Sequence, residues 1–184
     1  RLYMNNFNFC RPTDFYFGRG VEKDTGKICK KHGATKVLIH FGGGSALKSG
    51  LIDCVEKSLD EVGIEHIRLG GVLPNPRAEL VYEGIELCRK EKVDTVLAVG
   101  GGSVIDSAKA ICNGVKYDGD FWDFHMGGVV PEDSLTLGCV LTLAAAGSEG
   151  SNSCVINKVV NGVVKKKGCN CQCNVPDFAI MNPE

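Results

Sequence analysis

Two segments of the sequence each run from an apolar strand into three glycines and a serine, and this repeated pattern most constrains the fold. The first follows residues 36–41 and the second follows residues 96–99. Glycines let the backbone approach an anion without an intervening Cβ atom, and the helix that starts next presents free amide groups and the positive end of its dipole. The pattern predicts phosphate sites that, on neighbouring parallel strands, would hold the two ends of one dinucleotide. The residues are Gly42, Gly43, Gly44 and Ser45 in the first glycine loop (42–45), and Gly100, Gly101, Gly102 and Ser103 in the second (100–103).

The second loop reads GGGSxxD rather than the G-x-G-x-x-G of a standard dinucleotide fold, so a tight turn between strand and helix with no ligand remains an alternative. Asp106 also leaves two interpretations open. It lies about one turn into the expected helix, where it would hydrogen-bond a ribose or amide group of a bound nucleotide. Acidic side chains also stabilise the start of a helix through its dipole alone.

Strands and helices are expected to alternate along most of the chain. This order predicts an α/β fold, a Rossmann-like parallel sheet with helices on both faces. Asn75 is expected to cap the helix that follows it, with Pro76 in the first helical position. The expected strands span residues 36–41, 64–69, 94–99, 138–143 and 178–181, and the expected helices span residues 21–31, 46–62, 77–91 and 104–113.

Two further segments are expected to form β-structure at the periphery. Residues 5–17 alternate aromatic and polar side chains, which is typical of a hairpin or of a strand at the edge of a sheet. Residues 155–160 and 163–167 flank Asn161 and Gly162, which predicts a peripheral β-hairpin with a type I′ turn.

Composition and charge exclude several classes of protein. A chain of 184 residues with 43% hydrophobic content can bury the core of one ordinary domain. The net charge of −1 provides no field for a polyanion, so no nucleic-acid partner is expected. No apolar run approaches the ~20 residues that a membrane helix needs, and residues 1–20 contain no signal-peptide core, so we expect no membrane partner and a cytoplasmic protein.

Ten cysteines are mostly scattered singly through expected strands and helices, as small buried apolar residues would be. The exception is Cys169, Cys171 and Cys173, whose period of two would set three thiols on one side of an extended segment. A thiolate metal site or redox cluster is one interpretation. Idle thiols in a reducing compartment are favoured, because zinc sites normally use wider spacings.

Five motifs, placed in the order of one protein family, give the chain a close resemblance to the iron-containing (group III) alcohol dehydrogenases, in their butanol dehydrogenase branch. The resemblance extends from Asn5 to Pro183. The motifs are GGGS at 42–45, LPNP at 73–76, LAVGGGSVID at 97–106, GCVLTL at 138–143 and GSE at 147–149.

The resemblance implies a dehydroquinate synthase-like N-terminal domain that binds NADP or NAD. In this family the second glycine loop takes the cofactor pyrophosphate and the first lies at the adenosine ribose. The resemblance also implies contacts from Asp106 on the nicotinamide side, from Thr142 near the adenine ribose and from Ser151. The lysine that reaches the cofactor maps to Lys166, and Lys167 competes for the role.

Two departures from the family pattern qualify these expectations. Ala144 and Ala146 occupy positions where relatives often carry proline and threonine, so one hydrogen bond to the cofactor, worth about 0.5–1.5 kcal/mol, is expected to be missing. Relatives also continue well past this length, and one aspartate and three histidines of a helical second domain, beyond the position of Glu184, hold their divalent iron or zinc. We therefore expect residues 1–184 to be the NAD(P)-binding domain, with no metal ligand and no catalytic residue, and the full-length protein to be a homodimer.

The resulting hypothesis is the cofactor-binding part of an oxidoreductase that interconverts aldehydes and primary alcohols such as butanal and butanol. A truncated, non-catalytic nucleotide-binding or interaction domain is the alternative from another class, and a dehydroquinate synthase or glycerol dehydrogenase relative is a third. Gly44 and Ser45 leave room for a 2′-phosphate that Lys48 would neutralise, which favours NADP over NAD.

Overall fold

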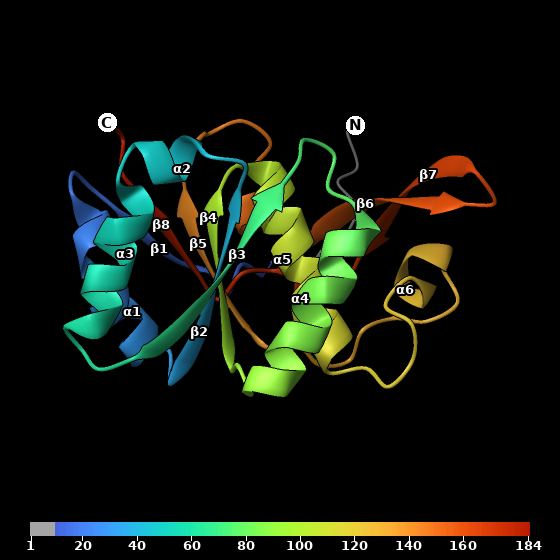
Figure 1. The fold of residues 1–184 in the computed structure, drawn as a ribbon, viewed down its shortest axis with the longest axis horizontal. Coiled ribbons are helices and arrows are strands. Elements are labelled where there is room, and N and C mark those ends of the chain that lie inside the picture. The colour runs from blue at the N-terminus through green and yellow to red at the C-terminus, as the bar shows by residue number, and fades with distance from the viewer. Residues whose placement is uncertain (1–9) are drawn as a thin grey trace, which may run out of the picture.

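A six-stranded, fully parallel sheet forms the centre of the molecule (Figure 1). The computed structural model describes residues 10–184, so the expected hairpin or edge strand at 5–17 lies partly outside the described residues; its described part is an edge strand, β1. The strand order β1-β8-β5-β4-β2-β3 confirms the predicted α/β class. The strands are β1 (Asp14–Phe17), β2 (Lys36–Gly42), β3 (Glu65–Val72), β4 (Thr95–Gly100), β5 (Thr136–Leu141) and β8 (Phe178–Met181).

Helices cover both faces of this sheet (Figure 1). The helices α1 (Thr25–Lys31) and α3 (Leu51–Asp60) pack on one face, and α4 (Ala78–Glu91) and α5 (Gly102–Val115) pack on the other. Each face therefore has its own apolar core. The strand β4 serves both: Val96 and Ala98 belong to the core under α4 and α5, whereas Leu97 and Val99 belong to the core under α1 and α3. Buried on both faces, β4 is one continuous apolar run, as expected for an inner parallel strand.

Two sequence predictions about helices are wrong. The helix expected at 46–62 is divided into α2 (Ser45–Lys48) and α3, because Gly50 adopts a left-handed φ of 76° between them. Asn75 does not cap α4, and Pro76 is not its first residue. Asn75 itself has a φ of 58°, the N-cap position is Arg77, and the helix begins at Ala78.

The predicted hairpin is confirmed, and it is longer than expected. It consists of β6 (Ser153–Val160) and β7 (Val163–Asn170), which pair antiparallel outside the main sheet and project from it beside α4 and α6 (Asp123–Met126) (Figure 1). Both turn residues have positive φ, 51° at Asn161 and 75° at Gly162, as a type I′ turn requires.

The prediction that the three cysteines lie on one side of an extended segment is only partly correct. β7 ends at Asn170, and Cys173 lies in the 3₁₀ turn Gln172–Asn174, so the three thiols do not share one face of a strand. The turn forms because Asn174 is fully buried and its side-chain amide donates to the carbonyl oxygens of Asn152 and Cys169, at 3.0 and 2.8 Å.

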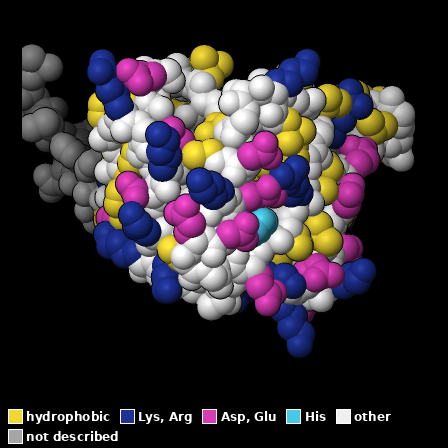
Figure 2. Space-filling view, turned by 60° about the vertical axis from the view of Figure 1, so that its left-hand side comes forward, with side chains coloured by type: hydrophobic (Ala, Val, Ile, Leu, Met, Phe, Trp, Pro, Cys, Tyr) yellow, Lys and Arg dark blue, Asp and Glu magenta, His cyan; other side chains and the backbone are white. Residues whose placement is uncertain are grey.

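Charge is spread evenly over the surface in view. Figure 2 shows Lys, Arg, Asp and Glu side chains intermingled across one face of the molecule, which agrees with a net charge of −1. Within residues 10–184, no helix combines the length and the apolar character needed to cross a membrane.

Candidate functional site: two glycine loops at the switch point of the sheet

The two glycine loops lie side by side at the carboxyl edge of the sheet. β2 and β4 are parallel neighbours with Phe41 opposite Val99, so loops 42–45 and 100–103 leave the sheet next to each other. From β2 the chain goes outward to β3, and from β4 it goes the other way to β5. Open α/β sheets bind ligands at such a reversal of strand order.

The second loop is closely packed: Gly100 is buried, and residues 101–103 are half-buried. A Cβ atom on Gly100 would lie 2.5 Å from Val104 Cγ2, and one on Gly102 would lie 3.3 Å from the Ser148 hydroxyl. The carbonyl of Gly101 accepts the amides of Val104 and Ile105 at 3.0 and 3.2 Å. The amides before them begin the 14-residue helix α5 and have no partner within it, so they are available to an anion.

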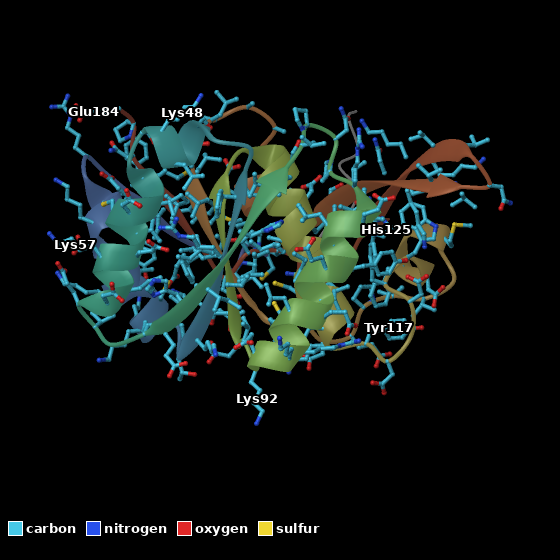
Figure 3. The ribbon with its side chains drawn as sticks, viewed as in Figure 1. Lys48, Lys57, Lys92, Tyr117, His125 and Glu184 are labelled. Carbon is cyan, nitrogen blue, oxygen red and sulfur yellow. The ribbon has the colours of Figure 1, made fainter. Side chains whose placement is uncertain are left out.

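The first loop is open. A Cβ atom on Gly43 or Gly44 would meet nothing within 4 Å, and Gly44 has a φ of 153°, a conformation that disfavours other residues. Ser45 is exposed and begins α2, which has only four residues. Lys48 extends from the end of α2 at the same edge of the molecule (Figure 3). The backbone of Gly43 and Gly44 therefore faces open space.

Thr142 joins the second loop to a neighbouring cavity. Its amide donates to the Gly100 carbonyl at 3.1 Å, which fixes the chain as it leaves β5. A cavity of about 440 Å³ lies beside it, between the carboxyl ends of β5 and β8 and the break between α2 and α3. Ser49, Gly50, Leu51 and Leu141 are among its lining residues.

Asp106 lies half-buried on α5, facing the base of the hairpin. Its Oδ2 atom accepts the Val155 amide at 3.0 Å, whereas Oδ1 is buried and has no hydrogen-bond partner among the described residues. Burial raises the pKa of this carboxyl, and the Val155 amide, the Lys109 ammonium and the nearby Ser148 hydroxyl oppose the rise. The side chain thus holds the hairpin with one oxygen and leaves the other for a donor.

Lys109 is a site residue that the sequence reasoning missed. Its side chain is fully buried, and Nζ donates to the carbonyls of Ser151 and Ser153 at 3.0 and 2.8 Å. Burial lowers the pKa of Lys109, and the Asp106 carboxyl opposes the effect. A lysine one turn after Asp106, flanked by Ala108 and Ala110, was the available signal. Ser151 is accordingly turned inward, with Oγ accepting the Ser153 amide at 3.2 Å.

The hairpin separates the two candidate lysines. Successive residues of a strand point to opposite faces, so Lys166 faces away from Lys165 and Lys167. Lys166 Nζ donates to Asn75 Oδ1 at 2.9 Å, in the loop after β3 at the same edge as the glycine loops. Lys167 instead lines a cavity on the other face of the hairpin.

A buried histidine links the strand before the first loop to the helix after the second. His40 Nδ1 lies 2.9 Å from the Leu69 carbonyl, and Nε2 lies 2.9 Å from the Ser107 hydroxyl on α5. Because a carbonyl only accepts, Nδ1 carries the proton and Nε2 accepts from Ser107. Complete burial lowers the pKa of His40 to about 4, so the ring is neutral at pH 7.

A metal site is not formed by the described part of the chain. Within residues 10–184, no group of three or more His, Cys, Asp or Glu side chains is arranged to hold a metal ion. Cys169, Cys171 and Cys173, for which a thiolate metal site was one interpretation, do not form such a group.

Comparison with known proteins identifies the family. The model of one family, described as iron-containing alcohol dehydrogenase, matches residues 12–183. The chain belongs to the iron-containing alcohol dehydrogenase family. This confirms the resemblance drawn from the five motifs.

Relatives and solved structures of this family match along the whole chain. A probable NADH-dependent butanol dehydrogenase 2 of Bacillus subtilis is 46% identical over 98% of the chain, and the NADPH-dependent aldehyde reductase YqhD of Escherichia coli is 37% identical over 98%. The crystal structure of NADH-dependent butanol dehydrogenase A from Thermotoga maritima superposes with a TM-score of 0.95 at 42% identity, over 100% of this chain and 46% of that one. The chain spans about half (46%) of the length of each of these relatives.

Proposed function

We propose that this chain is the nucleotide-binding domain of a metal- and NAD(P)-dependent alcohol dehydrogenase that interconverts aldehydes and primary alcohols such as butanal and butanol. One observation carries the proposal: two glycine loops leave adjacent parallel strands at the switch point, and the second starts a 14-residue helix. Relatives named for NADH-dependent and NADPH-dependent enzymes support the cofactor class, and those named for butanol dehydrogenases support the substrate class.

In this proposal the pyrophosphate lies against loop 100–103, where amides at the start of α5 have no helical partner. The adenosine ribose lies over loop 42–45, whose Gly43 and Gly44 face free space. The adenine enters the cavity of about 440 Å³ beside Thr142. All three contacts lie along one edge of the sheet, as a single extended ligand requires.

The remaining contacts come from α5 and the hairpin. We assign the unpartnered Oδ1 of Asp106 to the carboxamide amine of the nicotinamide, because it is a buried acceptor without a donor. Lys166 exchanges Asn75 for a ribose hydroxyl or phosphate of the cofactor. Ser151 contributes through its backbone segment, which Lys109 fixes.

Metal binding is not assigned to the described residues. Residues 10–184 do not supply a ligand set that fits one, so no step is derived through it. Hydride chemistry belongs to the nicotinamide, and the described residues bind and orient it.

Calorimetric titration of the chain with NADH and NADPH tests the proposal. We expect saturable heat with at least one of them, and a weaker response in a Gly102→Ala variant, whose added Cβ would approach the Ser148 hydroxyl. The absence of heat at millimolar concentrations of both cofactors would favour the non-catalytic alternative. Butanal-dependent oxidation of NAD(P)H, measured with added iron or zinc, then tests the reaction; turnover by residues 1–184 alone at rates usual for intact dehydrogenases would contradict an incomplete active site.

Two parts of the proposal concern the whole protein. We expect it to be a cytoplasmic homodimer, which sedimentation analysis of the whole protein and cell fractionation would test. The preference for NADP stays a prediction that depends on Lys48 and on the room above Gly44 and Ser45.

A further inference from the structure

The hairpin has a second binding face, turned away from the glycine loops. A cavity of about 620 Å³ lies there, lined by residues of both hairpin strands and by Trp122 and Met126 at the two ends of α6. Trp122, Met126 and Val160 give it an apolar lining, and Lys158, Lys165 and Lys167 supply its charged groups. This size and composition are typical of pockets for small organic ligands, which measure about 300–1,000 Å³.

The wall of this cavity is held in place by packing. The Trp122 ring is 6% exposed and stacks on His125 with 5.2 Å between ring centroids. His125 Nδ1 lies 3.1 Å from the Lys167 carbonyl, which ties α6 to β7 at this point (Figure 3). Met126, by contrast, is 63% exposed at the cavity. A rigid aromatic wall next to an exposed, adaptable thioether suits an aliphatic chain.

The charge at the cavity is not balanced. Residues 153–170 contain four lysines and no acidic residue. Lys158 and Lys165 are direct cross-strand partners, an unfavourable like-charge pair. Asp120 compensates Lys158, at 3.3 Å, and the Tyr82 hydroxyl also binds it at 2.6 Å. Lys165 and Lys167 form no ion pair with any residue in the described part of the chain.

We propose that this cavity binds an organic anion with an aliphatic tail, a medium-chain carboxylate. The tail packs against Trp122, Met126 and Val160, and the carboxylate lies between Lys165 and Lys167. The anion relieves the repulsion between Lys165 and Lys158. This site is separate from the cofactor cleft, because Lys166, between the two lysines, points to the opposite face of β7 toward Asn75.

Trp122 makes the proposal directly testable, because it is the only tryptophan in the chain. Octanoate is titrated into the full chain below its micelle-forming concentration while tryptophan fluorescence is followed. We expect a saturable change, at least 10-fold weaker with octanol, which has the tail without the charge, and with acetate, which has the charge without the tail. Equal responses to octanoate and octanol, or no saturable response to octanoate, would overturn the proposal.

Variants locate the site. The double variant Lys165→Glu/Lys167→Glu should weaken octanoate binding at least 10-fold, and Lys165→Gln/Lys167→Gln, a milder change, should weaken it less. The matched control Lys57→Glu/Lys92→Glu makes the same charge change on other parts of the molecule and should bind as the unchanged chain does (Figure 3). Circular dichroism establishes that each variant is folded. If Lys165→Glu/Lys167→Glu and the control Lys57→Glu/Lys92→Glu reduce octanoate binding equally, or if neither reduces it, the cavity is not the binding site.

Self-association provides one more discriminating measurement. Sedimentation without octanoate shows whether a second copy of the chain already covers the cavity. If the chain forms a dimer that the Lys165→Glu/Lys167→Glu variant dissociates and octanoate leaves intact, the face is a protein interface, and the proposal fails.

Discussion

The two glycine loops share the sequence GGGS and the same edge of the sheet, but they differ in what surrounds them. In loop 100–103, Gly100 and Gly102 lie so close to Val104 and Ser148 that a Cβ atom would collide or crowd, and a 14-residue helix follows. In loop 42–45, Gly43 and Gly44 have no neighbour within 4 Å, and the next helix has four residues.

This difference separates two uses of the same residue type. In the second loop, glycine permits close packing of a strand on a helix, so the amides at the start of α5 occupy fixed positions. In the first loop, glycine leaves an open backbone surface with little to hold it. A fixed donor array suits the pyrophosphate, which every nicotinamide dinucleotide shares, and an open loop suits the ribose, where NAD and NADP differ.

The largest expected effect involves His40, which couples the two loops. The pKa of His40 is lowered from 6.5 to about 4 in the folded protein, so between these values the unfolded chain takes up a proton that the folded chain does not. Stability should therefore fall as the pH decreases from 6.5 to 4, by on the order of 3 kcal/mol from this residue. Urea unfolding of the chain and of a His40→Gln variant at both pH values measures the difference. If the free energy of unfolding of the His40→Gln variant falls between pH 6.5 and pH 4 as much as that of the unchanged chain, His40 is not the group responsible.

The next largest effect is on stability, and it compares the closely packed second loop with the open first loop. Gly100→Ala places a Cβ atom 2.5 Å from Val104, a stiff buried side chain, and should reduce the free energy of unfolding by about 1–3 kcal/mol. Gly43→Ala, at an exposed position with nothing within 4 Å, should change it by less than about 0.5 kcal/mol. Thermal unfolding of both variants measures the contrast, and equal losses would show that the two loops are equally constrained.

A smaller effect concerns cofactor affinity. Gly102→Ala adds a methyl group 3.3 Å from the Ser148 hydroxyl, at the start of α5 where the pyrophosphate is proposed to lie. We expect binding of NADH and NADPH to weaken together by about 10-fold, or about 1.4 kcal/mol. Calorimetry measures both affinities, and Lys92→Gln is the control variant. Gly84→Ala is not suitable as a control, because its Cβ atom would enter the core. Unchanged affinity would move the pyrophosphate away from this loop.

The smallest expected effect distinguishes the cofactors at the first loop. Lys48→Gln removes an exposed charge at the end of α2 and should weaken NADPH binding by roughly 3-fold, about 0.6 kcal/mol, because exposed charge pairs contribute little. NADH, which lacks the 2′-phosphate, should bind as before. A parallel loss for both cofactors would mean that Lys48 acts on a group that they share.

The strand and glycine pattern was sufficient to predict the sheet and the position of both loops, because buried parallel strands and their turns are encoded locally. The same local reasoning failed at Asn75 and Pro76. A favourable capping sequence there gives way to a contact with the hairpin, in which the Asn157 amide donates to the Pro76 carbonyl at 2.8 Å. It also failed at Gly50, where one glycine ends a helix that the apolar spacing continues.

Part of the candidate site could also be predicted, because it too is encoded locally in the sequence. Backbone donors follow from glycine content, and Asp106 stood out by its place after the loop. Lys109 did not, because its role depends on carbonyls of Ser151 and Ser153, about forty residues later in the chain. Lys166 and Lys167 likewise stayed alternatives, because it is the placement of the hairpin against the sheet, which no local pattern supplies, that decides which of them faces the glycine loops.

That register has a consequence for how this domain can change. The two-residue turn at Asn161 and Gly162 fixes the pairing of the strands, and inserting one residue into β7 beyond the turn would rotate every later side chain to the opposite face. Lys165 and Lys167 would then point toward the glycine loops and Lys166 away from them. A single inserted codon could thus exchange the lysines presented at the two proposed sites, without substituting any residue of the chain.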